Sequence, residues 1–279
     1  LEGKLELMPF AFKDSEDLTK HIQKATNKIF NLRKEYPFTA EVYSLNDKKY
    51  LLVMVHHIAF DGWSVDIFLN ELNVFLGYYL NSNPIELNTP RIQYRDFAVW
   101  QREYLSGERL NNELEYWKNK LEGYENISLP TDRTRPTLVS YEGSNLNFNI
   151  DASTSKLIKK IAKEKSVTVY SVLLSAFYIL LYKYSSQEDL VIGVPMANRH
   201  YSDLEDVIGF FVNSLALRTK IESTASLTGF ITRVSEIMND AQGHQDIPFE
   251  KIVDELKVEK DLSRHPIFQI MFGVQSFGS

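Results

Sequence analysis

The chain contains no cysteine, so it forms no disulfide and offers no thiolate for catalysis. This absence favours a reducing compartment, and we expect a cytoplasmic protein. No apolar run reaches the roughly 20 residues that a transmembrane helix needs, and no secretory signal opens the sequence. Basic residues are in the minority, because the net charge is −6. That balance favours neither nucleic acid nor an anionic membrane surface as a partner.

Several motifs of familiar enzyme chemistry are also missing. The sequence has no GxSxG-type elbow for a nucleophilic serine and no glycine-rich loop for phosphate. It has neither an HExxH motif nor a cysteine and histidine spacing typical of zinc. Chemistry in this chain must therefore come from other side chains.

The 279 residues suffice for one large domain or for two lobes of about 100–150 residues each. The stretch LPTDRTRP, residues 129–136, is typical of an extended connector because of its prolines and polar residues. We place the lobe boundary there and expect lobes at 1–128 and 129–279. The chain begins with Leu1 rather than Met, so we expect a piece of a longer protein.

Hydrophobic periodicity predicts helices and strands on both sides of this connector. Apolar runs and alternation predict strands at 50–55, 146–150, 190–194, 211–217 and 267–274. Spacing of three and four residues predicts helices from residue 64 to the proline at 84, and at 94–105, 153–163, 169–184 and 227–240. Interleaved strands and helices predict α/β lobes.

Residues 55–64 read VHHIAFDGWS and place two adjacent histidines at the end of an expected buried strand. Side chains alternate across a strand, so we expect His56 and His57 to point to opposite faces. Imidazole takes up a proton near neutral pH and can serve as a base. Gly62 supplies the freedom that a tight turn needs, and its N–H near a helix start can bind a developing oxyanion. A metal site of His56, His57 and Asp61 is disfavoured, because adjacent strand histidines diverge.

The stretch VHHIAFDGWS resembles the HHxxxDG motif of nonribosomal peptide synthetase condensation domains. Further segments resemble motifs of that family in the same order: YRDFAVW (94–100), IGFFVNSLALR (208–218), HQDIPFE (244–250) and KDLSRHPI (260–267). The stretches VPMANR (194–199) and LPTDRTRP also look typical of it. The family's opening motifs, SxAQxRLWxL and RHExLRTxF, have no match, so we expect the front of the first lobe to be missing, and the end of the second as well. Lys260 and His265 stand where the family has Arg and Asn.

The resemblance implies an α/β fold of two chloramphenicol acetyltransferase-like lobes in a V shape with a central cleft, the first lobe truncated. It implies amide bond formation between an acyl or peptidyl thioester on an upstream carrier protein and an aminoacyl amine on a downstream carrier protein. Both substrates would ride on phosphopantetheine arms, and the domain itself would bind no cofactor and no metal. The partners would be these two peptidyl carrier proteins and a neighbouring adenylation domain, in the synthesis of secondary metabolites such as antibiotics.

The resemblance makes His57, the second histidine of the motif, the catalytic position, beside His56, Asp61 and Gly62. We expect His56 to be more structural, and Asp61 to lock the turn rather than to form a relay with histidine. The first candidate partner for Asp61 is Arg199 and the second is Arg218. The remaining residues are expected to shape the fold and the cleft: Trp63 by packing, Ser64 as a helix cap, Asn213 in a strand, and His244 and Asp246 in a loop.

Other functions remain open from the sequence. An epimerization domain shares the fold and the motif but usually continues with Val-Ser-Trp after the glycine, whereas Trp63-Ser64 follows here. A free-standing acetyl-CoA acyltransferase would not explain HQDIPFE and YRDFAVW. A non-catalytic module that docks carrier proteins is a third alternative. A truncated first lobe would expose apolar surface, so we also expect some self-association.

Overall fold

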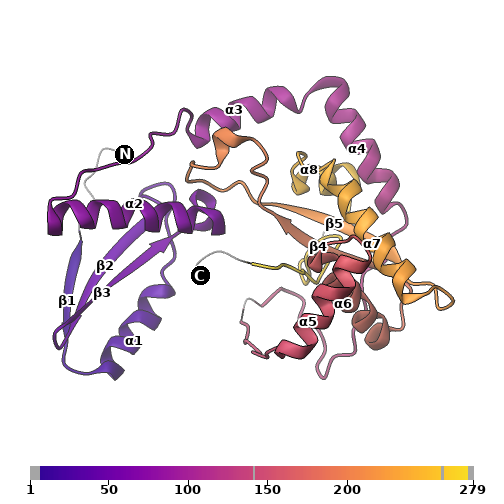
Figure 1. The fold of residues 1–279 in the computed structure, drawn as a ribbon, viewed down its shortest axis with the longest axis horizontal. Helices are drawn as coiled ribbons and strands as arrows, with labels where there is room; N and C mark the ends of the chain where they lie inside the picture. The colour runs from indigo at the N-terminus through magenta and orange to yellow at the C-terminus, as the bar shows by residue number, and fades with distance from the viewer. Residues whose placement is uncertain (1–6, 141, 259–260, 276–279) are drawn as a thin grey trace. The chain divides into compact units, whose positions relative to one another are not determined.

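The computed structural model describes residues 7–140, 142–258 and 261–275. Lys260 of the KDLSRHPI segment lies outside these described residues. The described chain forms two compact units, the first from residues 7–97 and 199–211 and the second from residues 98–198 and 212–275 (Figure 1). The first unit is therefore discontinuous in sequence, while the lobe limits at 1–128 and 129–279 stay a prediction.

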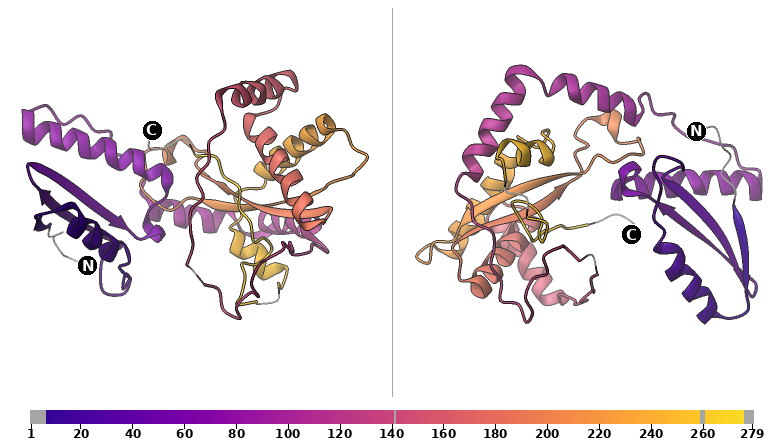
Figure 2. Two further views of the ribbon diagram at one scale, coloured as in Figure 1. Left: turned by 90° about the horizontal axis from the view of Figure 1, so that it is seen from below. Right: turned by 180° about the vertical axis from the view of Figure 1, so that it is seen from behind.

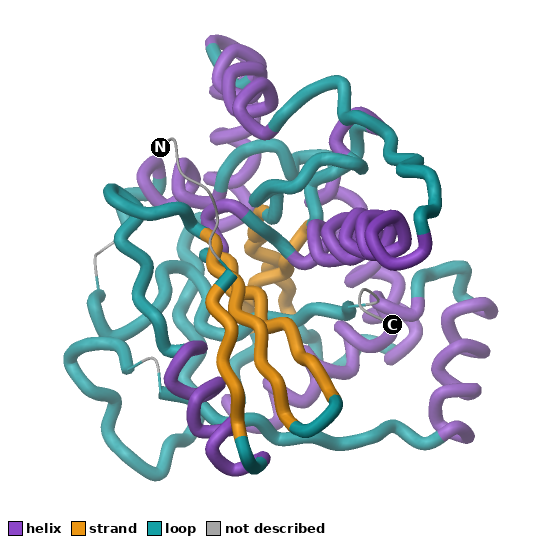
Figure 3. Tube along the Cα trace, turned by 90° about the vertical axis from the view of Figure 1, so that its left-hand side faces the viewer, coloured by secondary structure: helices purple, strands orange, loops and turns teal. Residues whose placement is uncertain are grey.

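The first unit is built on a three-stranded sheet in the order β1 (Met8–Phe12), β2 (Phe38–Leu45), β3 (Lys48–Val55). The first two strands are parallel and the last two antiparallel, and Figure 3 shows the three side by side. Helices α1 (Ser15–Thr26) and α2 (Gly62–Asn81) complete this part. The fully buried Tyr43 is bordered by the rings of Phe10, Phe12 and His21, which joins β1, β2 and α1.

The second unit packs its helices around the antiparallel pair β4 (Asp189–Met196) and β5 (Asn213–Lys220). Its helices are α4 (Gly107–Leu121), α5 (Ala152–Glu164), α6 (Val169–Ser185), α7 (Leu227–Gln242) and α8 (Phe249–Glu255). Helix α3 (Tyr94–Tyr104) begins in the first unit and ends in the second.

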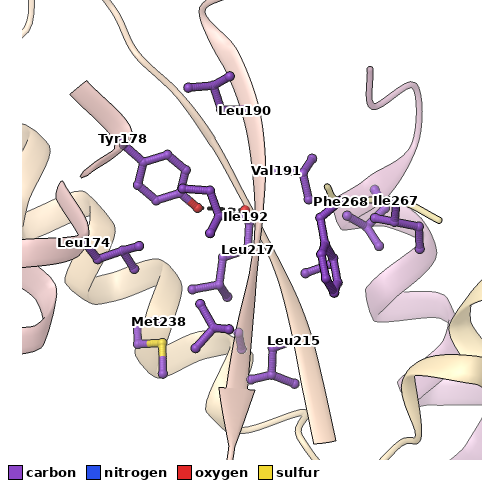
Figure 4. Close-up of a cluster of buried hydrophobic side chains, with 14 of the residues drawn as sticks. Leu174, Tyr178, Leu190, Val191, Ile192, Leu215, Leu217, Met238, Ile267 and Phe268 are labelled. Carbon is purple, nitrogen blue, oxygen red and sulfur yellow. Dashed lines mark hydrogen bonds between the residues drawn. The ribbon is translucent and has the colours of Figure 1, made fainter. Parts of the chain in front are cut away.

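The core of the second unit has a layer on each side of the β4–β5 pair. Leu174, Tyr178 and Met238 lie on one side, and Ile267 and Phe268 lie on the other (Figure 4). The buried Tyr178 hydroxyl donates to the Leu217 carbonyl at 2.7 Å, so burial leaves that oxygen hydrogen-bonded. Both faces of the strands are covered, which explains their continuous apolar sequences.

Glycine at 193 is required by that second layer. A Cβ atom added there would lie 2.3 Å from the ring of Phe268. The N–H and C=O of Gly193 also bond to Ile270 O and Phe272 N, both at 2.9 Å. The segment after residue 267 thus docks on the edge of β4.

Most predicted elements are confirmed, but two predicted strands are wrong. Residues 146–150 form no strand, and Leu146 and Phe148 are 90% and 79% exposed, because no neighbouring strand pairs with them. Residues 267–274 are irregular apart from one bridge between Gly193 and Met271. The strand expected from residue 211 begins at Asn213 instead. Further elements of the described chain lie outside the predicted ranges: β1, β2, α1, α4 and α8.

No single helix in the described ranges is long and apolar enough to cross a membrane. Helices α5 and α6 pass that test together by length and composition only, as a pair bent by 110° (Figure 2).

Candidate functional site in the first unit

The histidine pair lies in a turn rather than in the strand. Strand β3 ends at Val55, and residues 57–59 form a single 3-10 turn. The His56 Nδ1 caps this turn by accepting from the Ile58 N–H at 3.1 Å, and the His56 N–H donates to Pro37 O at 2.8 Å. The expectation that His56 and His57 point to opposite faces of a strand is therefore wrong, because both residues lie beyond the end of β3, where side chains no longer alternate.

The His57 imidazole is fixed in one tautomer by its neighbour. Its Nδ1 lies 2.6 Å from the carbonyl oxygen of Phe60. A carbonyl oxygen can only accept, so Nδ1 carries the hydrogen and Nε2 of the neutral ring keeps its lone pair. His57 is exposed. This arrangement presents a proton acceptor at Nε2.

Asp61 caps helix α2 with a fully buried side chain. One oxygen accepts from the Ser64 N–H at 3.0 Å, and the other accepts from the Phe211 N–H at 3.0 Å. The guanidinium of Arg199 donates to both oxygens at 3.0 and 3.1 Å. The predicted pairing with Arg199 is confirmed, and the second candidate, Arg218, is wrong. His57 and Asp61 form no relay, since His57 Nδ1 bonds to Phe60 O.

Arg199 ties its own loop to the turn at the same time. Its Nη1 donates to the carbonyls of Leu204 and Val207, both at 2.6 Å, and its guanidinium lies 4.1 Å from the ring centre of Phe211. Burial lowers the pKa of Arg199, while the charge of Asp61 acts in the opposite direction. Through the hydrogen bonds of Nη1 and Nη2, this buried charge holds residues 199–211 against the start of α2.

Ser64 does not cap the helix as predicted, because Asp61 occupies that position. Its buried hydroxyl lies 2.8 Å from the Asp61 carboxylate and accepts from the Gly209 N–H at 3.1 Å. Trp63, predicted to pack, is 44% exposed, and its Nε1 donates to the Glu205 carbonyl at 3.0 Å, so it holds the same loop through a hydrogen bond. Gly62 is the first helical residue, and the described glycines with positive φ are Gly107 and Gly123. The turn therefore does not need the conformational freedom of glycine at position 62.

Phe210 lies beside His57, and neither it nor its partner Tyr94 is among the site residues predicted from the sequence. The ring of Phe210 lies 4.9 Å from the His57 ring at 78°. The Tyr94 hydroxyl donates to the Phe210 carbonyl at 2.8 Å, and burial, aided by the charge of Asp61, raises the pKa of Tyr94. Gly209 is closely packed, since a Cβ atom there would lie 2.4 Å from the Tyr94 ring. The sequence signal for these residues was that Tyr94 lies in the YRDFAVW segment and that Gly209 and Phe210 lie in the IGFFVNSLALR segment.

Asn213, in the second unit, fixes the HQDIPFE loop to the start of β5. Its Nδ2 donates to the carbonyls of Gln245 and Ile247, both at 2.7 Å, and its Oδ1 accepts from the Phe249 N–H at 3.1 Å. Asp246 in the same loop also takes part in an interaction. One buried amide thus positions a whole loop.

His244 and Arg218 also hold elements of the second unit together. His244 Nδ1 lies 2.9 Å from a Glu113 oxygen, and its ring stacks on Tyr116 at 3.6 Å. Arg218 donates to both Asp189 oxygens at 2.9 and 2.7 Å and to Glu122 O at 2.6 Å, close to the end of α4. These contacts point to structural roles.

Within the ranges that the structure describes, no group of three or more His, Asp or Glu is arranged to hold a metal ion. Each candidate ligand has a hydrogen-bond partner instead: His56 bonds to Ile58, His57 to Phe60 and Asp61 to Arg199. The expectation that the domain binds no cofactor stays a prediction.

Comparison with known proteins matches residues 2–278 to the family model described as Condensation domain. One relative is N-(5-amino-5-carboxypentanoyl)-L-cysteinyl-D-valine synthase of Amycolatopsis lactamdurans, 41% identical over 98% of this chain. Another is malpinin synthetase of Mortierella alpina, 36% identical over 93% of this chain. The alignments cover 7% and 3% of those proteins, so the chain spans a small part of their length.

Solved structures of related domains have the same fold. The X-domain from teicoplanin biosynthesis superposes with a TM-score of 0.86 and 29% identity, over 96% of this chain and 60% of that one. The four-domain nonribosomal peptide synthetase AB3403, bound to AMP and glycine, gives a TM-score of 0.87 and 25% identity, over 99% of this chain and 21% of that one. The predicted α/β, chloramphenicol acetyltransferase-like fold is confirmed.

Proposed function

The chain belongs to the condensation-domain family, and from that premise we propose that it forms amide bonds between carrier-bound substrates in nonribosomal peptide synthesis. The acyl donor is a thioester on an upstream peptidyl carrier protein, and the acceptor is the amine of an aminoacyl group on a downstream one. The amine nitrogen attacks the thioester carbonyl, the C–N bond forms, and the C–S bond breaks. The lengthened amide stays on the downstream carrier, and the upstream arm leaves as a thiol.

The observation that carries this proposal is the tautomer of His57. Its Nδ1–H is held by Phe60 O at 2.6 Å, so Nε2 is the atom that can take the proton from the attacking amine. The same proton can then pass to the departing thiolate. An α-amine has a pKa of about 7.7–8.0, so a useful fraction is already neutral, and the base assists rather than creates the nucleophile. Asp61 and Arg199 act in this scheme by holding the turn.

The first test replaces His57 with alanine in the full polypeptide that contains this chain. With acyl donor and aminoacyl acceptor loaded on their carriers, amide formation is followed by intact mass. We expect a loss of about 10²–10⁴-fold, the usual share of a general base, while the control His200→Ala keeps the wild-type rate. Equal rates for His57→Ala and wild type would remove His57 from the chemistry. Exchange of the α-hydrogen in deuterated water without amide formation would indicate epimerization instead.

A second candidate is a non-catalytic docking domain. One structural neighbour, 29% identical, is the teicoplanin X-domain solved in complex with OxyB. For this chain, such a role predicts that carrier proteins bind and that neither amide formation nor α-hydrogen exchange follows. Binding measured by fluorescence anisotropy with loaded carriers, beside the mass assay, separates the two functions.

The setting we propose is a multidomain synthetase in the cytoplasm with an adenylation domain nearby. Its support is the AB3403 structure, a four-domain synthetase with a TM-score of 0.87 to this chain. Phosphopantetheine belongs in this scheme to the carrier proteins, which bring it as part of the substrate.

A further inference from the structure

Phe210 is the aromatic side chain that borders the His57 imidazole. Their ring centres lie 4.9 Å apart at 78°, which is the geometry of an edge-to-face pair. Its neighbours Gly209 and Phe211 are buried, whereas Phe210 is 36% exposed. Of these three consecutive residues, Phe210 is the one whose side chain is both outside the core and against the histidine.

The backbone around Phe210 is held on both sides by side chains. Its carbonyl accepts from the Tyr94 hydroxyl at 2.8 Å, and the next N–H, of Phe211, donates to Asp61 at 3.0 Å. The preceding N–H, of Gly209, donates to Ser64 Oγ at 3.1 Å. With the peptide groups 208–209 and 210–211 both fixed, the Cα–Cβ direction of Phe210 is set by the buried cluster beneath it.

Among the residues that the structure describes, the His57 ring makes a single hydrogen bond. The contact of Nδ1 with Phe60 O fixes the tautomer and the position of one ring atom. It does not by itself fix the orientation of the imidazole plane. An aromatic ring packed against the imidazole removes this orientational freedom. We infer that Phe210 is a positioning residue that holds the plane of the His57 imidazole so that Nε2 meets the attacking amine. The inference rests on the proposed function of His57.

A chemical probe of the imidazole tests the contact without the reaction. Diethyl pyrocarbonate acylates neutral imidazole, and peptide mapping by mass spectrometry gives a rate for each histidine. In the full polypeptide, Phe210→Ala should raise the rate at His57 and leave the rate at the exposed His200 unchanged. Phe210→Tyr keeps the ring and should restore the wild-type rate. Phe75→Ala, at a side chain with 40% exposure, is the matched control.

Rates of amide formation then test whether the contact matters for the reaction. We expect Phe210→Ala to lower kcat by about 10- to 100-fold, as misplacement of a catalytic group does, with little change in KM for either carrier. Phe210→Tyr should recover most of the rate. In a His57→Ala background, Phe210→Ala should have no further effect, because the two residues act as one unit.

The outcomes separate this inference from the proposed function. An unchanged His57 acylation rate in Phe210→Ala, or an equal rate loss with and without His57, overturns the positioning role. A polypeptide that forms no amide with any loaded donor refutes condensation, and the acylation rates still decide whether Phe210 holds the imidazole. Circular dichroism confirms that each variant is folded before either readout is used.

Discussion

At the scale of single residues, the site depends on one buried ion pair. Asp61 and Arg199 have side-chain exposures of 0% and 1%, and together they hold the start of α2 and the loop that carries Phe210. Removing one partner of such a pair leaves the other charge buried and without compensation. The conformation of the turn that carries His57 and the stability of its unit are therefore coupled through these two residues.

This coupling predicts a large effect from a small substitution. Asp61→Asn should lower the free energy of unfolding by about 3–5 kcal/mol, the usual cost of breaking a buried pair, measured by urea denaturation. Asp189→Asn is the matched control, because its pair with Arg218 is partly exposed, at 26% and 16%. We expect a smaller loss there. Equal losses would contradict the view that burial makes the Asp61 pair critical.

At the scale of helices and strands, the contribution of a helix cap to stability can be measured through the pKa of the capping carboxyl. Asp151 caps α5 by accepting from the Ser153 hydroxyl and from the Thr154 N–H and hydroxyl. These bonds, that from Ser153 first, lower the pKa of Asp151 from 3.8 to about 2. A carboxyl whose folded pKa lies below its unfolded value stabilises the fold above the unfolded pKa and loses this effect as pH falls.

The expected result is a difference between variants that depends on pH. Asn also caps helices but cannot titrate. The gap in unfolding free energy between wild type and Asp151→Asn should be constant above pH 5 and should shrink as pH falls from 3.8 toward 2. Urea titrations at several pH values measure it, with Asp132→Asn in the connector as the control. A gap that does not change with pH would contradict the assigned pKa.

Sequence patterns predicted those elements whose signal is local. The apolar run before the histidines and the periodicity from residue 64 correctly predicted β3 and α2. The alternation at residues 146–150 predicted a strand that the structure does not have. A strand also needs a neighbouring strand to pair with, and no local pattern reveals one. The pairing of Asp61 with Arg199 was predicted from charge and motif, whereas the contact of Phe210 with His57 was not, since it depends on how residues 199–211 fold back.

At the scale of the whole molecule, helix α2 leaves much apolar surface in contact with solvent. Its exposed side chains include Leu76, Tyr79 and Leu80, with 46%, 78% and 75% exposure. Contiguous apolar surface of this kind favours association. We therefore predict that the chain self-associates as its concentration rises.

Sedimentation velocity over a range of concentrations checks this prediction. Leu76→Lys with Leu80→Lys, one turn apart on α2, should shift the distribution toward monomer. Leu157→Lys, at a side chain with 59% exposure on α5, should leave it unchanged. A wild-type chain that remains monomeric at every concentration would show that this surface does not drive association.

The return of residues 199–211 to the first unit has a consequence for synthesis on the ribosome. Asp61 and Arg199 are 138 residues apart in the sequence. At roughly 5–20 residues per second, translation separates them by roughly 7–28 s. During that interval, the HHxxxDG turn exists without the cation that neutralises its carboxylate, and strand β4 is made before the first unit can close. A nascent chain that stops before residue 211 would carry both histidines and still lack the site.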